Sequence, residues 1–353
     1  MEGLGQRRAL TLGASLWLLG ACATAPASPG SATAPRPGAP SPTRVEAPKP
    51  PPLPELFESD DFVVTFAKAG DTPASLAQRF LGDPARAWMI EDYNQTSVLE
   101  AGREVIIPKR SWNPSGVDPS GYQLVPVLCY HNIGPQARGR LVLAAKSFEE
   151  QMRYLKTQGY RVVSLKTFLE FTALKRQLPR KTVVLTFDDG WKSFREYAYP
   201  ILKELGFSAT LFIYTDFVGS RSALSWEEMK ELDGQGFEIE AHSKTHADMR
   251  RKPGESEEEF TRRIQVELVQ PLTLFQKNIG RSSQILAYPY GSYDEEVQKR
   301  ARAAGYVAAF DVRRQGNPSF TPPLAIHRSQ IYSEMSLEDF AKNLNVFNQE
   351  PVK

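Results

Sequence analysis

The chain has 353 residues, of which 41% are hydrophobic and 24% are charged, so it can bury a large core and hold more than one domain. This composition excludes a largely disordered or membrane-embedded chain. The 43 basic and 41 acidic side chains give a net charge of +2, and the two signs are interspersed, which argues against nucleic acid as the main partner.

The N-terminal segment has the pattern of an export signal. Arg7 and Arg8 precede an apolar run at 9–19 that is too short to stay in a bilayer as a spanning helix, which predicts a signal peptide at 1–21. The sequence Leu-Gly-Ala-Cys at 19–22 resembles the cleavage box of bacterial lipoproteins. That resemblance implies a lipid on Cys22 as the membrane anchor and a place in the cell envelope, in the periplasm or on the cell surface. The alternative is an ordinary signal peptide that happens to contain Cys22.

A tether is expected to follow at 22–57. Residues 23–54 hold 11 of the 27 prolines of the chain together with many small residues, a composition that favours an extended segment without a core. If Cys22 carries a lipid, Cys129 has no disulfide partner within the chain. The apolar run at 125–128 before Cys129 predicts a buried structural thiol rather than a nucleophile.

Residues 58–110 predict a small β-α-α-β domain. Strand patterns at 62–64 and 104–108 enclose two short helical patterns, at 75–80 and around 88–93. The segment resembles a LysM module through Gly70–Thr72, Ala74–Ala77, Trp88–Ile90, Asn94, Leu99, Gly102 and Val105–Pro108. The resemblance implies binding to N-acetylglucosamine-containing glycans such as peptidoglycan or chitin, and the glycan-binding residues stay unknown. A spacer without a ligand is the alternative, and a linker is expected at 111–121.

From residue 122 to residue 353, strand and helix patterns alternate. Strands are predicted at 125–130, 162–163, 183–185, 209–213, 237–240, 285–288, 307–310 and 324–327. A helix is predicted to begin at Ser147, with Glu150 completing a capping box, and Ser225 and Glu228 predict a second box. Repeated β-α units indicate an α/β fold, a parallel (β/α) barrel or a distorted relative of one.

Two adjacent carboxylates stand where a buried strand opens into a loop. Asp188 and Asp189 lie in the sequence Thr-Phe-Asp-Asp-Gly at 186–190, directly after an apolar run. Two ionised carboxylates at that depth repel each other and lose hydration, so a cation or a shared proton is expected between them.

Two of the four histidines lie four residues apart, at His242 and His246. Neutral imidazoles at that spacing can converge on one cation, and a carboxylate can supply a third ligand. One of Asp188 and Asp189 fits that place, which leaves the other free as a general base. The alternative is a pair of surface histidines at a common helical spacing.

These segments together resemble the polysaccharide deacetylases, the NodB-homology carbohydrate esterases, from about residue 125 to residue 331. The sequences at 186–190, 242–246 and 288–291 match the first three motifs of that family, and 126–131 matches the opening strand of one branch. The resemblance implies a distorted NodB-type (β/α) barrel and a divalent metal, with zinc favoured. It implies Asp189, His242 and His246 as metal ligands and Asp188 as general base. The backbone N–H of Tyr290 is implied to form part of an oxyanion hole.

Two histidines compete for the role of general acid. In most of the family this acid is a histidine on a late strand, which points to His327. In the branch with Tyr-His on the first strand, the early histidine resembles the acid, which points to His131. His131 is favoured because it ends a predicted strand, and a hydrogen-bonded packing histidine is the alternative for either residue.

The chain departs from the family pattern at two places. Ala287 stands where many relatives carry an arginine thought to orient the base. The aspartate and tryptophan of the usual fourth motif are not evident, although Asp311 could serve. Trp191, Tyr214, Trp226 and Tyr293 are candidates for a glycan platform, with core packing favoured for each.

The expected function is therefore metal-dependent hydrolysis of the N-acetyl group of N-acetylglucosamine units in peptidoglycan or a related envelope polysaccharide. An O-deacetylase is one alternative, because the same attack of water serves an ester. A catalytically silent glycan-binding protein of the envelope is the other.

Overall fold

The computed structural model describes residues 56–350. The expected signal peptide, the lipid on Cys22 and most of the tether lie outside the described residues. The last two residues of the expected tether, Leu56 and Phe57, belong to strand β1 (Leu56–Glu58). None of the helices in the described part of the chain has the length and apolar character needed to cross a bilayer.

A three-stranded antiparallel sheet and two α-helices form the first folded unit. Its elements are β1, β2 (Phe62–Phe66), α1 (Pro73–Leu81), the short 3₁₀ helix η1 (Pro84–Arg86), α2 (Ala87–Asn94) and β3 (Glu104–Pro108). Thr72 caps α1 with a capping box. Pro73 suits the first turn because it has no backbone N–H, and the N–H groups of a first turn have no acceptor within the helix. Asn94 fastens α2 to β3, because its amide donates to Ile106 O at 2.6 Å and its carbonyl accepts from Ile106 N at 3.0 Å. The predicted β-α-α-β order is confirmed.

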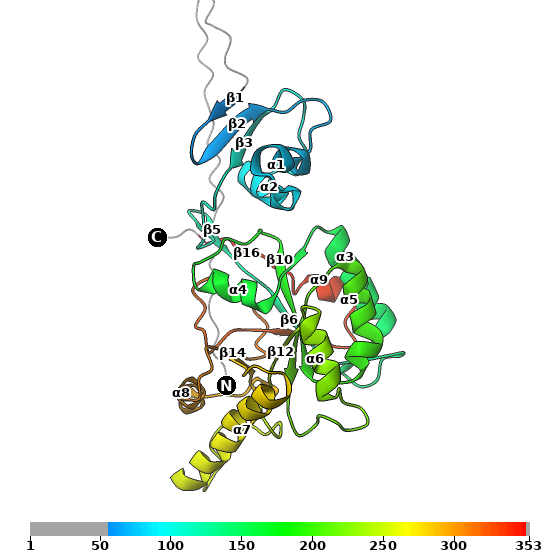
Figure 1. Cartoon of the computed structure of the whole chain (residues 1–353), viewed down its shortest axis with the longest axis vertical. Coiled ribbons are helices and arrows are strands. Elements are labelled where there is room, and N and C mark those ends of the chain that lie inside the picture. The colour runs from blue at the N-terminus through cyan, green and yellow to red at the C-terminus, as the bar shows by residue number, and fades with distance from the viewer. Residues whose placement is uncertain (1–55, 351–353) are drawn as a thin grey trace, which may run out of the picture. The chain divides into compact units, whose positions relative to one another are not determined.

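Parallel strands form the main sheet of the second unit, in the order β14-β13-β12-β11-β10-β6-β15, with β9 beside the start of β10 (Figure 1). These strands are β6 (Val127–Tyr130), β9 (Arg161–Val162), β10 (Thr182–Asp189), β11 (Thr210–Ile213), β12 (Glu238–Ala241), β13 (Ile285–Ala287), β14 (Ala308–Phe310) and β15 (Ser329–Gln330). Two small sheets accompany the main one: a three-stranded sheet of β4 (Val117–Asp118), β5 (Gly121–Gln123) and β16 (Phe347–Asn348), and a two-stranded sheet of β7 (Asn132–Gly134) and β8 (Val142–Ala144).

One residue bridge joins the two edges of this sheet. Ile326 pairs with Phe310 of β14, and three residues later Ser329 pairs with Leu128 of β6. The prediction of a strand at 324–327 is therefore wrong. Only Ile326 of that stretch forms a bridge, and the strand that pairs with β6 begins two residues after the stretch ends, at Ser329. Pro322 and Pro323 have no N–H to donate to a ladder. The result is consistent with the expected distorted barrel: a parallel half-barrel sheet whose two edges are joined through the segment at 323–329.

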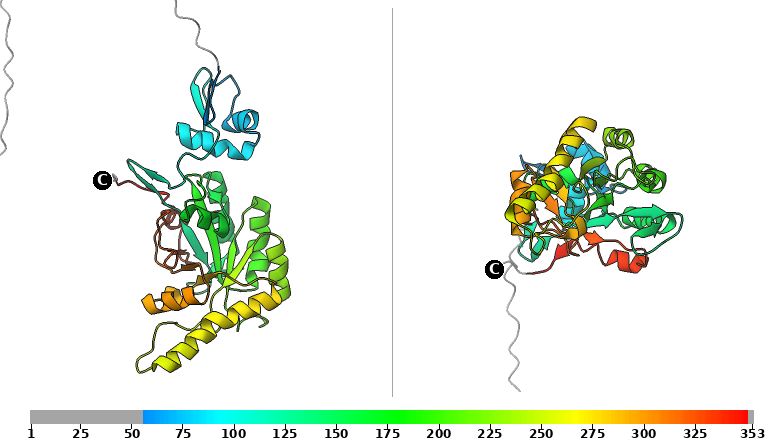
Figure 2. Two further views of the ribbon diagram at one scale, coloured as in Figure 1. Left: turned by 60° about the vertical axis from the view of Figure 1, so that its left-hand side comes forward. Right: turned by 90° about the horizontal axis from the view of Figure 1, so that it is seen from below.

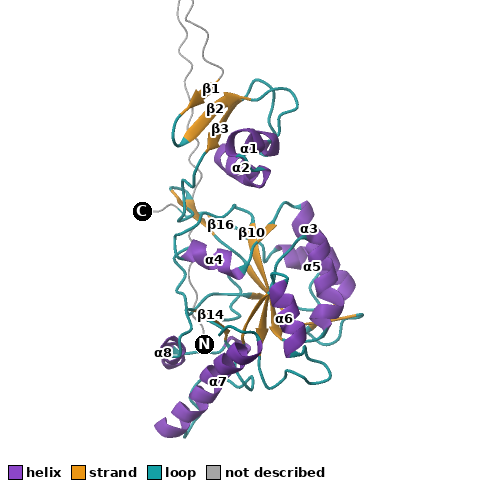
Figure 3. Ribbon diagram, viewed as in Figure 1, coloured by secondary structure: helices purple, strands orange, loops and turns teal. Residues whose placement is uncertain are grey.

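Helices surround the sheet (Figure 3). They are α3 (Ala145–Thr157), α4 (Leu165–Thr172), the π-helical turn η2 (Phe194–Ala198), α5 (Tyr199–Leu205), α6 (Trp226–Gly234), α7 (Glu257–Asn278), the 3₁₀ turn η3 (Pro289–Gly291), α8 (Glu295–Ala303) and α9 (Leu337–Ala341). The capping box predicted at Ser225 is confirmed. The box predicted at Ser147 is wrong: α3 begins at Ala145, and its N-cap Ala144 has no side chain that can cap. The 22-residue α7, yellow in Figure 2, is the longest described helix. It lies between the strands predicted at 237–240 and 285–288, where no helix was predicted.

Alternate residues of the strands face two different cores. Leu185 of β10 and Leu211 of β11 belong to the core between sheet and helices, whereas Val184 and Phe212 belong to a smaller core inside the barrel. Side chains of a strand alternate between its faces, so Asp188, four residues after Val184, shares the inner face. The barrel interior is thus filled with apolar side chains up to the carboxyl ends of the strands, where the polar residues begin.

Candidate active site

The carboxyl ends of β10 and β12 bring the two predicted motifs together. Asp189 Oδ1 lies 3.8 Å from His242 Nε2 and 3.5 Å from His246 Nε2. Asp188 Oδ2 lies 3.7 Å from His242 Nε2. The segments 186–190 and 242–246 therefore meet, as the sequence predicted.

Asp189, His242 and His246 form a donor set that fits a divalent cation. One ligand atom from each lies within 4.8 Å of the others. Asp189 Oδ1 is buried and has no hydrogen-bond partner among residues 56–350, while its Oδ2 accepts the indole N–H of Trp191 at 2.9 Å. His242 Nδ1 lies 2.8 Å from Ala287 O, so the other ring nitrogen, Nε2, is available to a cation. Burial lowers the pKa of His242, which favours the neutral ring that a metal ligand needs. A carboxylate oxygen and imidazole nitrogens in this arrangement suit zinc or a similar metal.

Backbone strain is concentrated at these residues. Asp189 (φ 78°), Ser243 (φ 74°), His246 (φ 63°) and Tyr290 (φ 60°) adopt the left-handed region, which ordinary side chains rarely adopt. Each such residue costs about 1–3 kcal/mol and persists only where its surroundings hold it in place. These four make up most of the six strained non-glycine residues that the described chain contains.

Arg328 holds the carboxylate of Asp188 with two parallel hydrogen bonds. Its Nη1 and Nη2 donate to Asp188 Oδ1 at 2.6 Å and to Oδ2 at 2.8 Å, and both side chains are buried. Burial alone would raise the pKa of Asp188, but the charge and hydrogen bonds of Arg328 outweigh it and hold the pKa well below its usual range. The guanidinium also donates to Asp311 O at 3.0 Å and lies 5.1 Å from the centre of the Phe212 ring.

This arginine supplies what Ala287 lacks. Ala287 is buried in the inner core on β13, at the position where the family resemblance implies an arginine that orients the base. Arg328 reaches the base from the opposite edge of the sheet, next to β15. The role of Arg328 could not be predicted from the sequence, because 140 residues separate it from Asp188 and no local motif marks it.

The two candidate acids lie in different surroundings. A ring nitrogen of His131, a carboxylate oxygen of Asp188 and Cys129 Sγ all lie within 4.8 Å of one another. His131 Nδ1 is buried without a hydrogen-bond partner among the described residues. His327, by contrast, has its Nδ1 3.1 Å from Asp311 Oδ2.

Cys129 is fully buried, as predicted, and burial raises the pKa of its thiol. Its Sγ donates to Asp188 Oδ2 at 3.4 Å, a contact that the sequence did not indicate.

Aromatic rings surround the histidine loop. Tyr290 is 64% exposed and its ring meets that of His246 edge to face, with 4.6 Å between centres. The centre of the Tyr214 ring lies 5.2 Å from that of His246, and the Trp191 ring packs against Phe217, which stacks on Tyr214. Of the four candidate platform residues, Trp191 and Tyr214 are therefore at the site. The other two pack elsewhere, Trp226 against Phe275 and Tyr293 against Tyr288.

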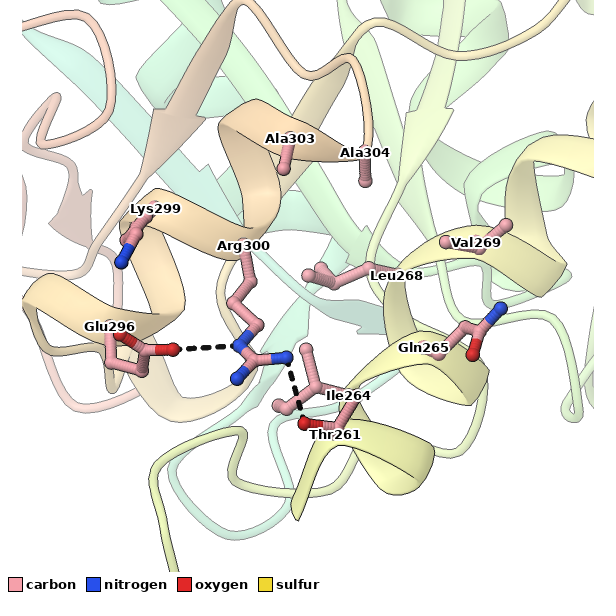
Figure 4. Close-up of a pocket in the computed structure, with 10 residues that line it drawn as sticks. All are labelled: Thr261, Ile264, Gln265, Leu268, Val269, Glu296, Lys299, Arg300, Ala303 and Ala304. Atoms are coloured by element: carbon pink, nitrogen blue, oxygen red, sulfur yellow. Dashed lines mark hydrogen bonds and ion pairs between the residues drawn. The ribbon is translucent and has the colours of Figure 1, made fainter. Parts of the chain in front are cut away.

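A separate hollow of about 420 Å³ lies between α7 and α8 (Figure 4). Ile264 and Leu268 of α7 line it opposite Ala303 and Ala304, and Arg300 bonds to Glu296 and Thr261 at its edge. None of the predicted site residues lines this hollow.

Residues 175–309 match the model of the polysaccharide deacetylase family. The Bacillus subtilis protein YxkH, whose name assigns it to the polysaccharide deacetylases, is 29% identical over 212 residues, which are 60% of this chain and 73% of that protein. A poly-beta-1,6-N-acetyl-D-glucosamine N-deacetylase of Staphylococcus aureus is 29% identical over 183 residues, 49% of this chain and 62% of that enzyme, which is less than two thirds of its length.

Solved structures show the same fold. The structure of IcaB from Ammonifex degensii superposes with a TM-score of 0.57 at 25% identity, over 64% of this chain and 99% of that one. The Streptococcus pyogenes deacetylase PplD superposes with the same TM-score of 0.57 at 23% identity, covering 64% and 99%. Residues 175–309 are therefore similar to the polysaccharide deacetylase family, and the parallel-strand fold around them is the one that these deacetylase structures share.

Proposed function

We propose that this protein is a metal-dependent N-deacetylase of N-acetylglucosamine units in peptidoglycan or a related envelope polysaccharide. The observation that carries the proposal is Asp189 Oδ1, which has no hydrogen-bond partner within the described part of the chain and lies within 3.8 Å of two imidazole nitrogens, beside the carboxylate of Asp188. The N-deacetylase activity named for the staphylococcal relative supports the choice of reaction.

Asp189, His242 and His246 would hold a divalent cation, with zinc favoured. When bound, the cation supplies Lewis-acid polarisation of the acetyl carbonyl and makes a nearby water more acidic. Asp189 presents one oxygen to the cation because Trp191 occupies the other. His242 presents Nε2 because Ala287 O fixes its Nδ1.

The remaining residues move the protons. Asp188 takes a proton from the attacking water, and Arg328 keeps that carboxylate ionised and fixed in its plane. His131, on the same side of the barrel as Asp188, gives a proton to the leaving amine as the amide C–N bond breaks. The backbone N–H of Tyr290 stabilises the oxyanion, so that the products are acetate and a glucosamine unit.

The N-terminal parts would bring the enzyme to its substrate. In this proposal the β-α-α-β unit is a LysM-like module that binds the same glycan, and a lipid on Cys22 anchors the protein in the bacterial envelope. The proline-rich tether between them would let the catalytic domain reach polymer away from the membrane.

The test is acetate release by the full chain from N-acetylglucosamine oligomers and from peptidoglycan, with metal content measured in the same preparation. We expect acetate and new primary amines in equal amounts, lost on chelation and restored by zinc. Acetate from O-acetylated glycan alone, without new amines, would favour the O-deacetylase instead. A protein that retains glycan but binds no metal and releases no acetate would refute the enzyme proposal.

Two variants test the assigned roles. Asp188→Asn should abolish turnover and keep the metal, whereas His242→Ala should lose the metal. The reverse pattern would refute the assignment of base and ligand.

A further inference from the structure

The loop that carries both histidines is held in a strained conformation. Between His242 and His246, Ser243 and His246 adopt φ values of 74° and 63°. One internal bond, from His246 N to Ser243 Oγ at 3.0 Å, closes the turn. A loop of this kind needs further contacts to stay in place, because each left-handed residue costs about 1–3 kcal/mol.

The backbone N–H groups of Thr215 and Asp216 donate to Ser243 O at 3.2 Å and to Lys244 O at 2.9 Å, and one carboxylate on α7 accepts the N–H groups of the loop. Glu267 Oε2 accepts the backbone N–H groups of Lys244 at 3.1 Å and of Thr245 at 2.9 Å. Its Oε1 accepts the hydroxyl of Thr245 at 2.6 Å. Two of the three residues between His242 and His246 are therefore bound to Glu267.

Glu267 is buried, with 3% of its surface exposed. A buried carboxylate is stable only where hydrogen bonds replace its hydration, and successive backbone N–H groups of a turn are suited to bind an anion. Bonds to an ionised acceptor are about twice as strong as bonds between neutral groups. Removal of this carboxylate would take the acceptor from two partly buried backbone N–H groups and one hydroxyl of the loop.

The helix that carries Glu267 is itself fixed. Ile264 and Leu268, on either side of Glu267, belong to the main core. Tyr306 donates its hydroxyl to Leu268 O at 2.9 Å, which ties this turn of α7 to the chain after α8. The carboxylate is thus presented from a rigid element rather than from a mobile surface.

We propose that Glu267 is a positioning residue that sets the metal affinity of the histidine loop. It touches neither substrate nor cation. It holds Lys244 and Thr245 so that His242 and His246 direct their Nε2 atoms at Asp189 Oδ1. The proposal rests on the proposed metal centre but is distinct from it, since a metal could bind without help from Glu267.

The experiment measures zinc affinity of the full chain by competition with a chelator, and the visible absorption of the cobalt-substituted protein. Loss of a group that orients metal ligands typically weakens binding about 10–100-fold, and we expect that loss in Glu267→Ala together with a changed cobalt spectrum. Glu267→Gln should bind zinc more tightly than Glu267→Ala, because its carbonyl can still accept both backbone N–H groups and its amide can donate to the Thr245 hydroxyl. Thr245→Val, which removes one of the three bonds, should fall between wild type and Glu267→Ala.

The control is Leu268→Ala, which damages the same turn of α7 without touching the loop. It should lower the melting temperature and leave zinc affinity within about 2-fold of wild type, since it removes packing but no contact to the loop. Wild-type affinity in Glu267→Ala would overturn the proposal, as would an equal loss in Leu268→Ala. If Glu267→Ala does not fold, wild-type affinity and spectrum in both Glu267→Gln and Thr245→Val would overturn it. A wild-type protein that binds no divalent metal would instead refute the proposed metal centre.

Discussion

Replacement of Arg328 by methionine tests the electrostatic design of the site most directly. The variant leaves Asp188 buried beside an apolar side chain, without the two hydrogen bonds of 2.6 and 2.8 Å that it now accepts from the guanidinium. Removal of one partner of a buried ion pair costs about 3–5 kcal/mol, and we expect the free energy of unfolding at pH 7 to fall by that amount. For a domain of this size each kcal/mol lowers the melting temperature by about 2–4 °C, so the expected drop is about 6–20 °C.

The effect should depend on pH with a definite sign. In the wild type the pKa of Asp188 is lowered by Arg328, so the ion pair stabilises the fold above the pKa of an unfolded aspartate, about 3.9, and this stability is lost as pH falls below it. In Arg328→Met burial is no longer opposed by the charge and hydrogen bonds of Arg328, so the pKa of Asp188 rises above its wild-type value and the destabilisation grows as pH rises above about 3.9. The difference in melting temperature between the two proteins should therefore be largest near neutral pH and shrink toward pH 4.

The same change should move the pH–rate profile. A base with a raised pKa is protonated over more of the acidic range, so the acidic limb of kcat/KM should shift to higher pH in Arg328→Met. The assays are thermal unfolding from pH 4 to pH 8 and acetate release over the same range. Arg313→Met is the control, because this arginine is 64% exposed in its contact with Asp311 and such a pair contributes about 0–1 kcal/mol. An equal melting-temperature gap at pH 4 and pH 7, with an unmoved acidic limb, would refute the reasoning.

Three further predictions follow from the contacts of the site. Trp191→Phe removes the indole N–H that Asp189 Oδ2 accepts at 2.9 Å, and zinc affinity measured by chelator competition should weaken about 10-fold, whereas Trp226→Phe should leave it unchanged. Gly291→Ala places a methyl group 2.6 Å from Val312 N at φ +66° and should cost about 2–4 kcal/mol in chemical unfolding, against about 1 kcal/mol for Gly254→Ala, which has open space at φ +76°. His131→Ala should lower kcat about 10²–10⁴-fold with the metal retained, and a larger loss in His327→Ala would reverse the assignment of the acid.

The sequence predicted the elements better than their ends. The capping residues Ser225 and Glu228 were identified because a capping box is a local pattern, and the structure has it. The similar pattern at Ser147 was misleading, because the chain turns into α3 directly from β8 and the helix begins two residues earlier, at Ala145. The stretch at 324–327 has the composition of a strand, but its pairing is set by the neighbouring strands at the seam of the barrel.

The residues of the candidate site divide in the same way. Asp188, Asp189, His242 and His246 could be found because each pair is adjacent or closely spaced in sequence, and strand ends of a parallel sheet meet at one edge. Trp191 was noticed as an aromatic residue, but its bond to Asp189 depends on the left-handed backbone at Asp189. Glu267 and Cys129 carried no sign of their contacts with the site.

The sequence by itself determined most strands of the parallel sheet and the group of acids and imidazoles suited to a cation, because local spacing along the chain decides both. Only the tertiary structure decided how that group is held. Arg328 meets Asp188 because β15 returns beside β6, the neighbour of β10. Glu267 meets the histidine loop because α7 places its carboxylate against the loop. Contacts between residues far apart in sequence depend on the closure and packing of the whole sheet, which no local pattern encodes.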